Sequence, residues 1–162
     1  MSMTASLLVV WHSRTGASEA MAKAVAEGAE PAVDLMMARD VGPEHLRMAA
    51  GYVFVCPENL ATMSGEMKEM FDRCYYPVLG KLEGRPFATA IAAGSDGEGA
   101  QRQIDRIAKG WRLKRVAEPI IVTTHAQEPA TILAPKVLTE SQLLPCRELG
   151  KAFANGLELG IF

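Results

Sequence analysis

Short apolar runs alternate along the chain with segments in which apolar residues recur at helical spacing. The apolar runs cover residues 7–11, 32–37, 51–56, 87–94 and 115–124, and each predicts a β-strand. Runs such as 51–56 are apolar at nearly every position, which is typical of strands covered on both faces. Pro119 in the fifth run indicates a sheet edge or a bulge, because proline cannot donate to the strand ladder.

Helical spacing follows most of these runs. It predicts helices that begin near Ala17, Met63, Ala100 and Cys146, and a short helix from Pro43, a residue type favoured in the first helical turn. Residues 125–145 are punctuated by prolines and are predicted to be mostly loop. Strands that alternate with helices predict one α/β domain over residues 1–162, with a parallel sheet between two helical layers.

Composition narrows the class of protein. The chain has 162 residues, of which 49% are hydrophobic and 22% charged, as expected for a soluble globular domain. The net charge of -2 and the lack of a basic block argue against a nucleic acid or an anionic membrane as partner. No apolar run approaches the roughly 20 residues that a membrane span requires.

Cysteine and histidine positions give no sign of a metal site. Cys56, Cys74 and Cys146 are far apart, odd in number and never at a CxxC spacing. We interpret them as free buried thiols, which fits a reducing, cytoplasmic location. The three histidines are not at metal-ligand spacing to one another or to a cysteine.

Ligand sites of such sheets lie at the carboxyl ends of the strands, which directs attention to three loops. The first, residues 12–18, carries hydroxyls around Gly16 just before a predicted helix. The unpaired amides and the dipole of a helix N-terminus attract anions, so this loop could hold a phosphate. Helix capping by Ser13 and Ser18 is the simpler alternative. The loop lacks the lysine of a Walker A motif and the glycines of GxGxxG.

Two further loops are predicted at the same edge. Residues 57–63 follow the third strand and offer apolar surface and backbone amides against which a flat ring could lie, although an ordinary strand-to-helix connection is the alternative. Residues 94–99 form a glycine-rich turn with Ser95. Lys68, Asp72 and Arg73 have helical spacing, and we interpret them as surface ion pairs and not as a catalytic cluster.

Together the three loops resemble those of a known family. "SRTGAS" matches the [ST]-x-T-G-x-[ST] phosphate loop of flavodoxins, while "CPENLATMSGEMKEMFDR" and "AGSDGEGAQ" are similar to segments of flavodoxin-like NAD(P)H-dependent FMN reductases and quinone oxidoreductases. The resemblance implies a three-layer, doubly wound, flavodoxin-like fold with a five-stranded parallel sheet in the order 2-1-3-4-5. It also implies noncovalently bound FMN, with NAD(P)H as co-substrate.

The resemblance assigns candidate cofactor-binding residues. It implies that the phosphate is held by Ser13, Arg14, Thr15, Gly16, Ala17 and Ser18. It places beside the isoalloxazine ring Pro57, Glu58, Asn59, Leu60, Ala61, Thr62 and Met63. It places on the other edge of the ring Gly94, Ser95, Asp96 and Gly97. The quinone-reductase relatives usually carry a hydroxyl-aromatic-glycine run where this chain has residues 58–61.

The functional expectation is an oxidoreductase that passes electrons through FMN to a quinone, a flavin or a similar small acceptor. No catalytic side chain is predicted, because the cofactor supplies the chemistry. His125, after the fifth strand, could line the substrate side, although satisfying a loop is its simpler role. The resemblance also implies a possible homodimer.

Three other classes are weighed against this expectation. An electron-carrier flavodoxin with a protein partner is the main alternative, but the mild charge and the lack of aromatic residues in the loops favour the enzyme. A cofactor-free binding module stays open. A receiver domain is excluded, because Ser13 and Thr15 stand where that fold needs an acidic metal pocket.

Overall fold

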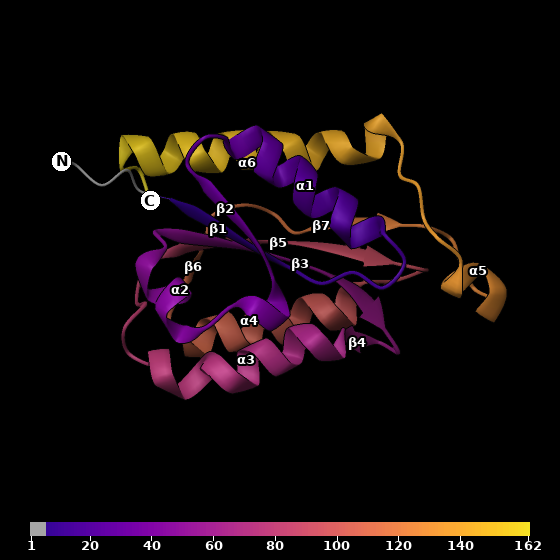
Figure 1. Cartoon of the computed structure of the whole chain (residues 1–162), viewed down its shortest axis with the longest axis horizontal. Helices are drawn as coiled ribbons and strands as arrows, with labels where there is room; N and C mark the ends of the chain where they lie inside the picture. Colours follow the sequence, from indigo (N-terminus) through magenta and orange to yellow (C-terminus); the bar gives the residue numbers. More distant parts are fainter. Residues whose placement is uncertain (1–5) are drawn as a thin grey trace.

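A parallel sheet forms the centre of the computed structural model, which describes residues 6–162 (Figure 1). Its strands are β1 (Leu7–Trp11), β2 (Val33–Met37), β3 (Gly51–Asn59), β5 (Pro86–Ala93), β6 (Lys114–Arg115) and β7 (Ile120–Thr123). The order is β2-β1-β3-β5-β6, and β7 also pairs with β5. All of these pairs are parallel. This arrangement confirms the predicted flavodoxin-like, doubly wound fold and its order 2-1-3-4-5.

The fifth position of the sheet is interrupted. β6 pairs with Pro86 and Phe87 at the start of β5, and β7 pairs with residues 90–93 at its end. The four residues between them include Pro119, which cannot donate to the ladder. The sheet edge predicted from this proline is therefore confirmed, since the interruption lies at the outermost strand position.

Helices cover both faces of the sheet (Figure 1). One face is packed by α1 (Ala17–Ala29) and α6 (Glu140–Leu159). The other is packed by α2 (Pro43–Met48), α3 (Gly65–Val78) and α4 (Glu98–Gly110), and a short 3₁₀ turn (Ala38–Asp40) adds to it. Alternate residues of β1 enter the two cores, as strand geometry requires: Leu7 and Val9 face α1, while Leu8 and Val10 face the opposite layer.

The prediction of a mostly irregular segment over residues 125–145 was wrong in part. It contains α5 (Pro129–Leu133), and α6 begins at Glu140 and not at Cys146. Thr139 caps α6, since its Oγ1 accepts a hydrogen bond from the Gln142 amide at 3.2 Å. Pro145 lies in the second turn of this helix, where it removes one amide donor without ending the helix.

The cysteines have the predicted character. All three are free and buried. Burial raises the pKa of Cys56 to about 12 and that of Cys146 to about 11, so both thiols stay protonated and unreactive. Among the described residues, no helix is long and apolar enough to cross a membrane.

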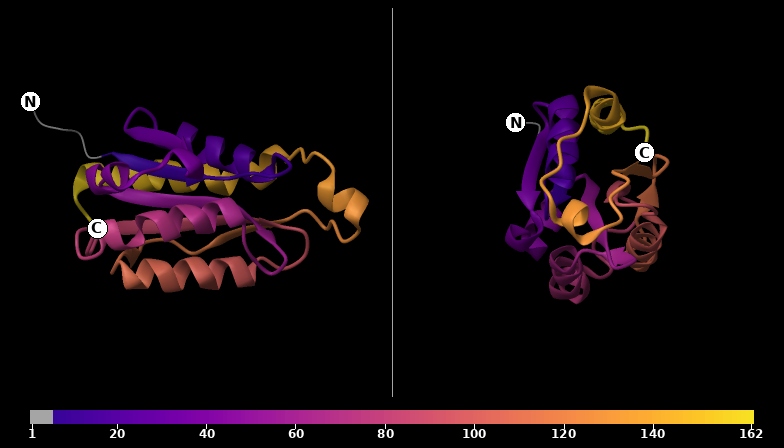
Figure 2. Two further views of the ribbon diagram at one scale, coloured as in Figure 1. Left: turned by 60° about the horizontal axis from the view of Figure 1, so that its bottom comes forward. Right: turned by 90° about the vertical axis from the view of Figure 1, so that its right-hand side faces the viewer.

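The carboxyl ends of the strands meet at one edge of the sheet. The first turn of α1, the connection between β3 and α3, and the start of α4 all lie there, and α5 stands beyond them (Figures 1 and 2). The hairpin formed by the end of β3 and β4 (Thr62–Met63) also belongs to this edge. The edge therefore gathers all three loops that the sequence singled out.

Candidate functional site

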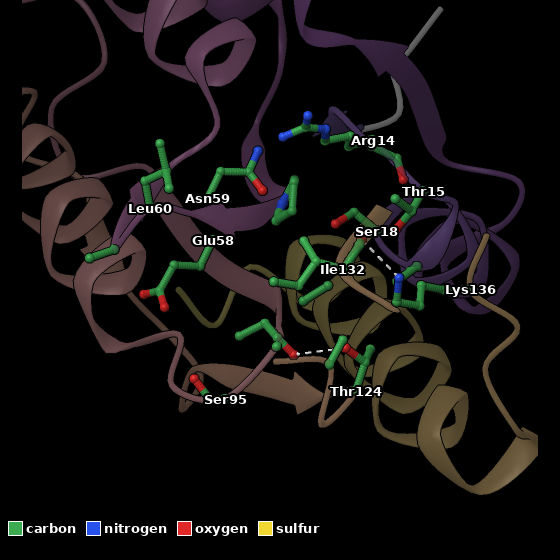
Figure 3. Close-up of a pocket in the computed structure, with 18 residues that line it drawn as sticks. Arg14, Thr15, Ser18, Glu58, Asn59, Leu60, Ser95, Thr124, Ile132 and Lys136 are labelled. Carbon is green, nitrogen blue, oxygen red and sulfur yellow. Dashed lines mark hydrogen bonds between the residues drawn. The ribbon is translucent and has the colours of Figure 1, made fainter. Parts of the chain in front are cut away.

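A cavity of about 260 Å³ opens at this edge (Figure 3). Four segments contribute to its wall: the loops after β1, β3 and β5, and the segment from the end of β7 to the start of α6. Its lining residues are Ser13, Arg14, Thr15, Ala17, Ser18, Pro57, Glu58, Asn59, Leu60, Ala61, Ala92, Ala93, Gly94, Ser95, Thr124, Ala126, Ile132 and Lys136. The structure thus brings the three predicted loops together around one space.

The loop after β1 is shaped by Gly16, the N-cap residue of α1. Its φ of 105° lies in the left-handed region that favours glycine. The Gly16 amide donates to Ser13 Oγ at 3.0 Å, which closes the loop, but no side chain caps the first turn of α1, so the capping alternative was wrong. The amides of the first turn of α1 have no intrahelical acceptors, and the helix dipole adds positive potential. The geometry suits a bound anion.

Ser18 does not act as a cap. Ser18 is 1% exposed. Within residues 6–162, its Oγ is the one buried side-chain polar atom that lacks a hydrogen-bond partner. A buried hydroxyl without a partner is destabilising, and native structures rarely keep one without a reason. Because Ser18 lines the cavity, an oxygen-rich ligand there would supply the missing partner.

Two cationic side chains stand at the same end of the cavity (Figure 3). Arg14 is exposed. The Lys136 ammonium donates to the carbonyls of Thr131, Ile132 and Ala134 at 2.7, 3.0 and 2.6 Å. These bonds provide donors for carbonyl groups at the C-terminal end of α5. The Lys136 amide donates to the carbonyl of Thr15 at 2.8 Å. This last bond ties the segment after α5 directly to the loop after β1.

The loop after β3 is a tight β-hairpin. Glu58 pairs with Met63 and Asn59 with Thr62 across the antiparallel β3–β4 ladder. The two turn residues, Leu60 and Ala61, have φ of 53° and 65°, which matches the primed turns that two-residue hairpins favour. Leu60 is 98% exposed at the tip. One wall of the cavity is therefore a short, defined hairpin and not an irregular connection.

Five of the predicted residues lie outside the lining. They are Gly16, Thr62, Met63, Asp96 and Gly97. Met63 is 3% exposed and packs in the core under α3 and α4, and its amide donates to Gln103 Oε1 at 2.8 Å. The side chain of Met63 is thus structural, although its hairpin borders the cavity.

The sequence interpretation missed the fourth segment of the wall. It includes Thr124, Ala126, Ile132 and Lys136. Residues 125–145 were predicted to be mostly loop, and only His125 was considered there as a residue that could line the substrate side. The available signal was Pro129 followed by "ATIL", since proline is favoured at a helix start.

The other polar residues that the sequence offered as candidates do not line the cavity. His125 is exposed and is not among the lining residues. His12 is part of a polar group beneath the first loop: its Nδ1 lies 2.8 Å from Ser64 Oγ, and its Nε2 lies 3.4 Å from Glu66 Oε2. Burial lowers the pKa of His12. Lys68 pairs with Asp72, and Arg73 with Glu69, as surface pairs along α3.

Solved structures with the same architecture include flavodoxins and flavodiiron proteins. An archaeal flavodoxin superposes with a TM-score of 0.73 at 20% identity, over 94% of this chain and 99% of its own. A WrbA-like flavodoxin from Agrobacterium tumefaciens gives 0.74 at 19% identity, over 96% and 98%. A Synechocystis flavodiiron core gives 0.76 at 17% identity, over 98% of this chain and 37% of its own. These likenesses define the class as a flavodoxin-like α/β fold.

The family is narrower than the fold. The family model for NADPH-dependent FMN reductases matches residues 43–126, just over half of the chain. The chain therefore belongs to the NADPH-dependent FMN reductase family. The matched region contains the second and third loops and ends at Ala126 in the fourth segment of the cavity wall. A comparison with curated protein sequences finds no match.

Proposed function

We propose that this protein binds FMN in the cavity and passes electrons from NADPH or NADH to a quinone, a flavin or a similar small acceptor. The observation that carries the proposal is the anion site at the start of α1, where the buried Ser18 Oγ lacks a partner within residues 6–162. The convergence of three loops on this site, and membership of the family, support the same ligand.

The phosphate group would be held at the α1 end of the cavity. Hydroxyls of Ser13, Thr15 and Ser18 can donate to phosphate oxygens, and so can the amides of Thr15, Ala17 and Ser18. Gly16 shapes the loop, and its amide already donates to Ser13 Oγ. Arg14 and Lys136 contribute positive charge at this end. Because most of these donors are dipoles fixed by the fold, the site needs little rearrangement on binding.

The flavin ring would lie between the second and third loops. On one side would stand the hairpin residues that line the cavity, Pro57, Glu58, Asn59, Leu60 and Ala61, while Thr62 and Met63 lie outside the lining. On the other edge would stand Gly94 and Ser95, while Asp96 and Gly97 lie outside the lining. Ala92, Ala93 and Ile132 add apolar surface to the cavity.

When bound, FMN would supply the hydride and electron transfer chemistry. The residues of this chain would bind the phosphate, orient the ring and leave part of it open to substrates. The proposal assigns no side-chain acid or base. The protein therefore only has to position the flavin, and we assign this task to the hairpin and the glycine-rich loop.

The test is spectroscopic. We expect the purified protein to be yellow, or to become so with added FMN, and to release FMN on denaturation. NADPH or NADH should bleach the flavin absorbance under anaerobic conditions, and a quinone should restore it. A protein that stays colourless after incubation with FMN would contradict the proposal.

The same experiment separates the enzyme from an electron-carrier flavodoxin. Flavin that binds but is bleached by neither nucleotide would favour the carrier, which would then need a protein partner for reduction. The homodimer and the cytoplasmic location inferred from the sequence stay predictions.

A further inference from the structure

One carboxylate joins the second loop to the third. Glu58 lies near the end of β3 and lines the cavity. Its Oε1 accepts a hydrogen bond from the Gly97 amide at 2.9 Å, and its Oε2 accepts one from the Ala100 amide at 3.2 Å. Gly97 is the N-cap residue of α4, and Ala100 lies in its first turn. The carboxylate therefore occupies the positive end of the α4 dipole.

The contact between the two loops is close. A Cβ on Gly99 would lie 2.0 Å from the carbonyl oxygen of Ala61 and 3.2 Å from Glu58 Oε2. Only glycine allows α4 to approach the hairpin this closely. A second bond lies beside it, from the Met63 amide to Gln103 Oε1 at 2.8 Å. The hairpin is thus hydrogen-bonded to α4 at its base, through Glu58 and Met63, and its turn residue Ala61 also packs against Gly99.

The hairpin tip makes this fastening necessary. Leu60 and Ala61 both have positive φ, a conformation that non-glycine residues keep only where the surroundings fix it. Leu60 is 98% exposed, so its own side chain contributes little packing. We therefore expect the bonds at the base, together with the contact between Ala61 and Gly99, to fix the tip against the cavity.

We propose that Glu58 is a positioning residue: its carboxylate acts as an internal anion at the start of α4 and holds the hairpin wall of the flavin cavity. The inference rests on the proposed function for the identity of the ligand. It also assigns different roles to the starts of α1 and α4. The start of α1 is left for the phosphate of the ligand, whereas the start of α4 is filled by the protein itself and excludes a second phosphate.

Two variants test the role of Glu58. Glu58→Ala removes both acceptors. Glu58→Gln keeps the size and one acceptor but turns an NH₂ group toward an amide donor. We expect both variants to weaken FMN and riboflavin by a similar factor, about tenfold or more, because a charged hydrogen bond to the wall is lost. Fluorescence titration of the two flavins measures this.

Replacement of the lost anion gives a more specific readout. In Glu58→Ala, sodium formate or acetate should restore flavin affinity and raise the melting temperature of the flavin-free protein toward the wild-type value. Sodium chloride at the same ionic strength should do neither. The matched control is Glu98→Gln, which removes an exposed carboxylate from the same helix turn and should bind both flavins as the wild type does.

Several results would overturn the inference. They are wild-type affinity in both Glu58 variants, an equal loss in Glu98→Gln, or a loss in Glu58→Ala that neither carboxylate reduces. If Glu58→Ala does not fold, Glu58→Gln alone decides by its affinity for riboflavin. Failure of the wild type to bind any flavin contradicts the proposed function instead, and the carboxylate-dependent stability of flavin-free Glu58→Ala still tests the role of Glu58.

Discussion

The Ser18 hydroxyl lowers the stability of the ligand-free protein but would contribute to binding of the proposed ligand. Its hydroxyl is buried and, in the part of the chain that the structure describes, has no hydrogen-bond partner. Leaving such a group unpaired costs about 1–3 kcal/mol. Ser13, by contrast, is engaged by the Gly16 amide. The two serines that the sequence treated alike as possible caps therefore have different roles.

Replacing Ser18 with alanine should separate these effects. We expect Ser18→Ala to leave the melting temperature of the flavin-free protein unchanged or to raise it by about 2–4 °C, because an unpaired hydroxyl is removed and alanine favours helix. The same change should weaken FMN about tenfold and riboflavin hardly at all, since riboflavin has no phosphate. Calorimetry and fluorescence titration measure the two quantities.

Riboflavin is the internal control of this experiment. Equal losses for the two flavins would mean that Ser18 acts on the ring or on the fold and not on the phosphate. A clear drop in the stability of the flavin-free protein would show that the hydroxyl has a structural partner.

At the scale of elements, the position of α1 depends on its packing against α6. The two helices approach so closely that a Cβ on Gly28 would lie 2.0 Å from the carbonyl oxygen of Arg147, and a Cβ on Gly150 would lie 1.9 Å from that of Val25. The proposed anion site is the first turn of α1, so α6 fixes the orientation of the helix dipole there. We therefore expect helix packing to affect ligand binding as well as stability.

Gly150→Ala tests this packing. The added methyl group must push α1 and α6 apart, and overpacking of this kind typically costs about 1–3 kcal/mol. We expect the urea-unfolding free energy of the flavin-free protein to fall by that amount and FMN affinity to fall with it.

Gly65→Ala is the matched control. Gly65 is the first residue of α3, and among the described residues no heavy atom lies within 4 Å of an added Cβ. This change should be neutral or stabilise the protein by about 0.4–1 kcal/mol. If Gly150→Ala proved no more destabilising than Gly65→Ala, this would contradict the close packing of α1 against α6.

For the whole molecule, the proposed ligand bridges segments that are distant in the sequence. The cavity is closed by residues from Ser13 to Lys136, so a bound ligand would connect the first strand to the segment before the last helix. A ligand that binds only the folded state stabilises it by about 2.7 kcal/mol at a hundred times its Kd.

Thermal unfolding measures this linkage. We expect FMN at a hundred times its Kd to raise the melting temperature by about 5–10 °C. Riboflavin at the same concentration should raise it less, because the anion site at α1 stays empty. No shift with FMN would show that the flavin does not bind the folded chain.

The order of elements follows from the sequence because burial leaves a periodic pattern. Apolar runs such as residues 51–56 and the helical stripe that begins at Ala17 predict a parallel sheet, and the topology of such a sheet places its ligand edge. Topology singled out the loops after β1, β3 and β5, the resemblance named the residues within them, and the fourth lining segment, with Thr124 to Lys136, was missed. The start of α6 was misplaced because Pro145 suggested a helix boundary, whereas the cap at Thr139 determines it.

What the sequence by itself determined is therefore the layered α/β fold and the edge at which its loops meet, since both depend on local spacing and strand direction. The tertiary structure alone decided which side chains share a contact. In the folded chain, the Glu58 carboxylate accepts from the Gly97 amide at the start of α4, and Met63 lies in the core, where its amide donates to Gln103. The Lys136 amide donates to the Thr15 carbonyl in the loop after β1. These partners are about 40 residues or more apart along the chain, and no local pattern encodes which groups will lie within hydrogen-bonding distance after packing.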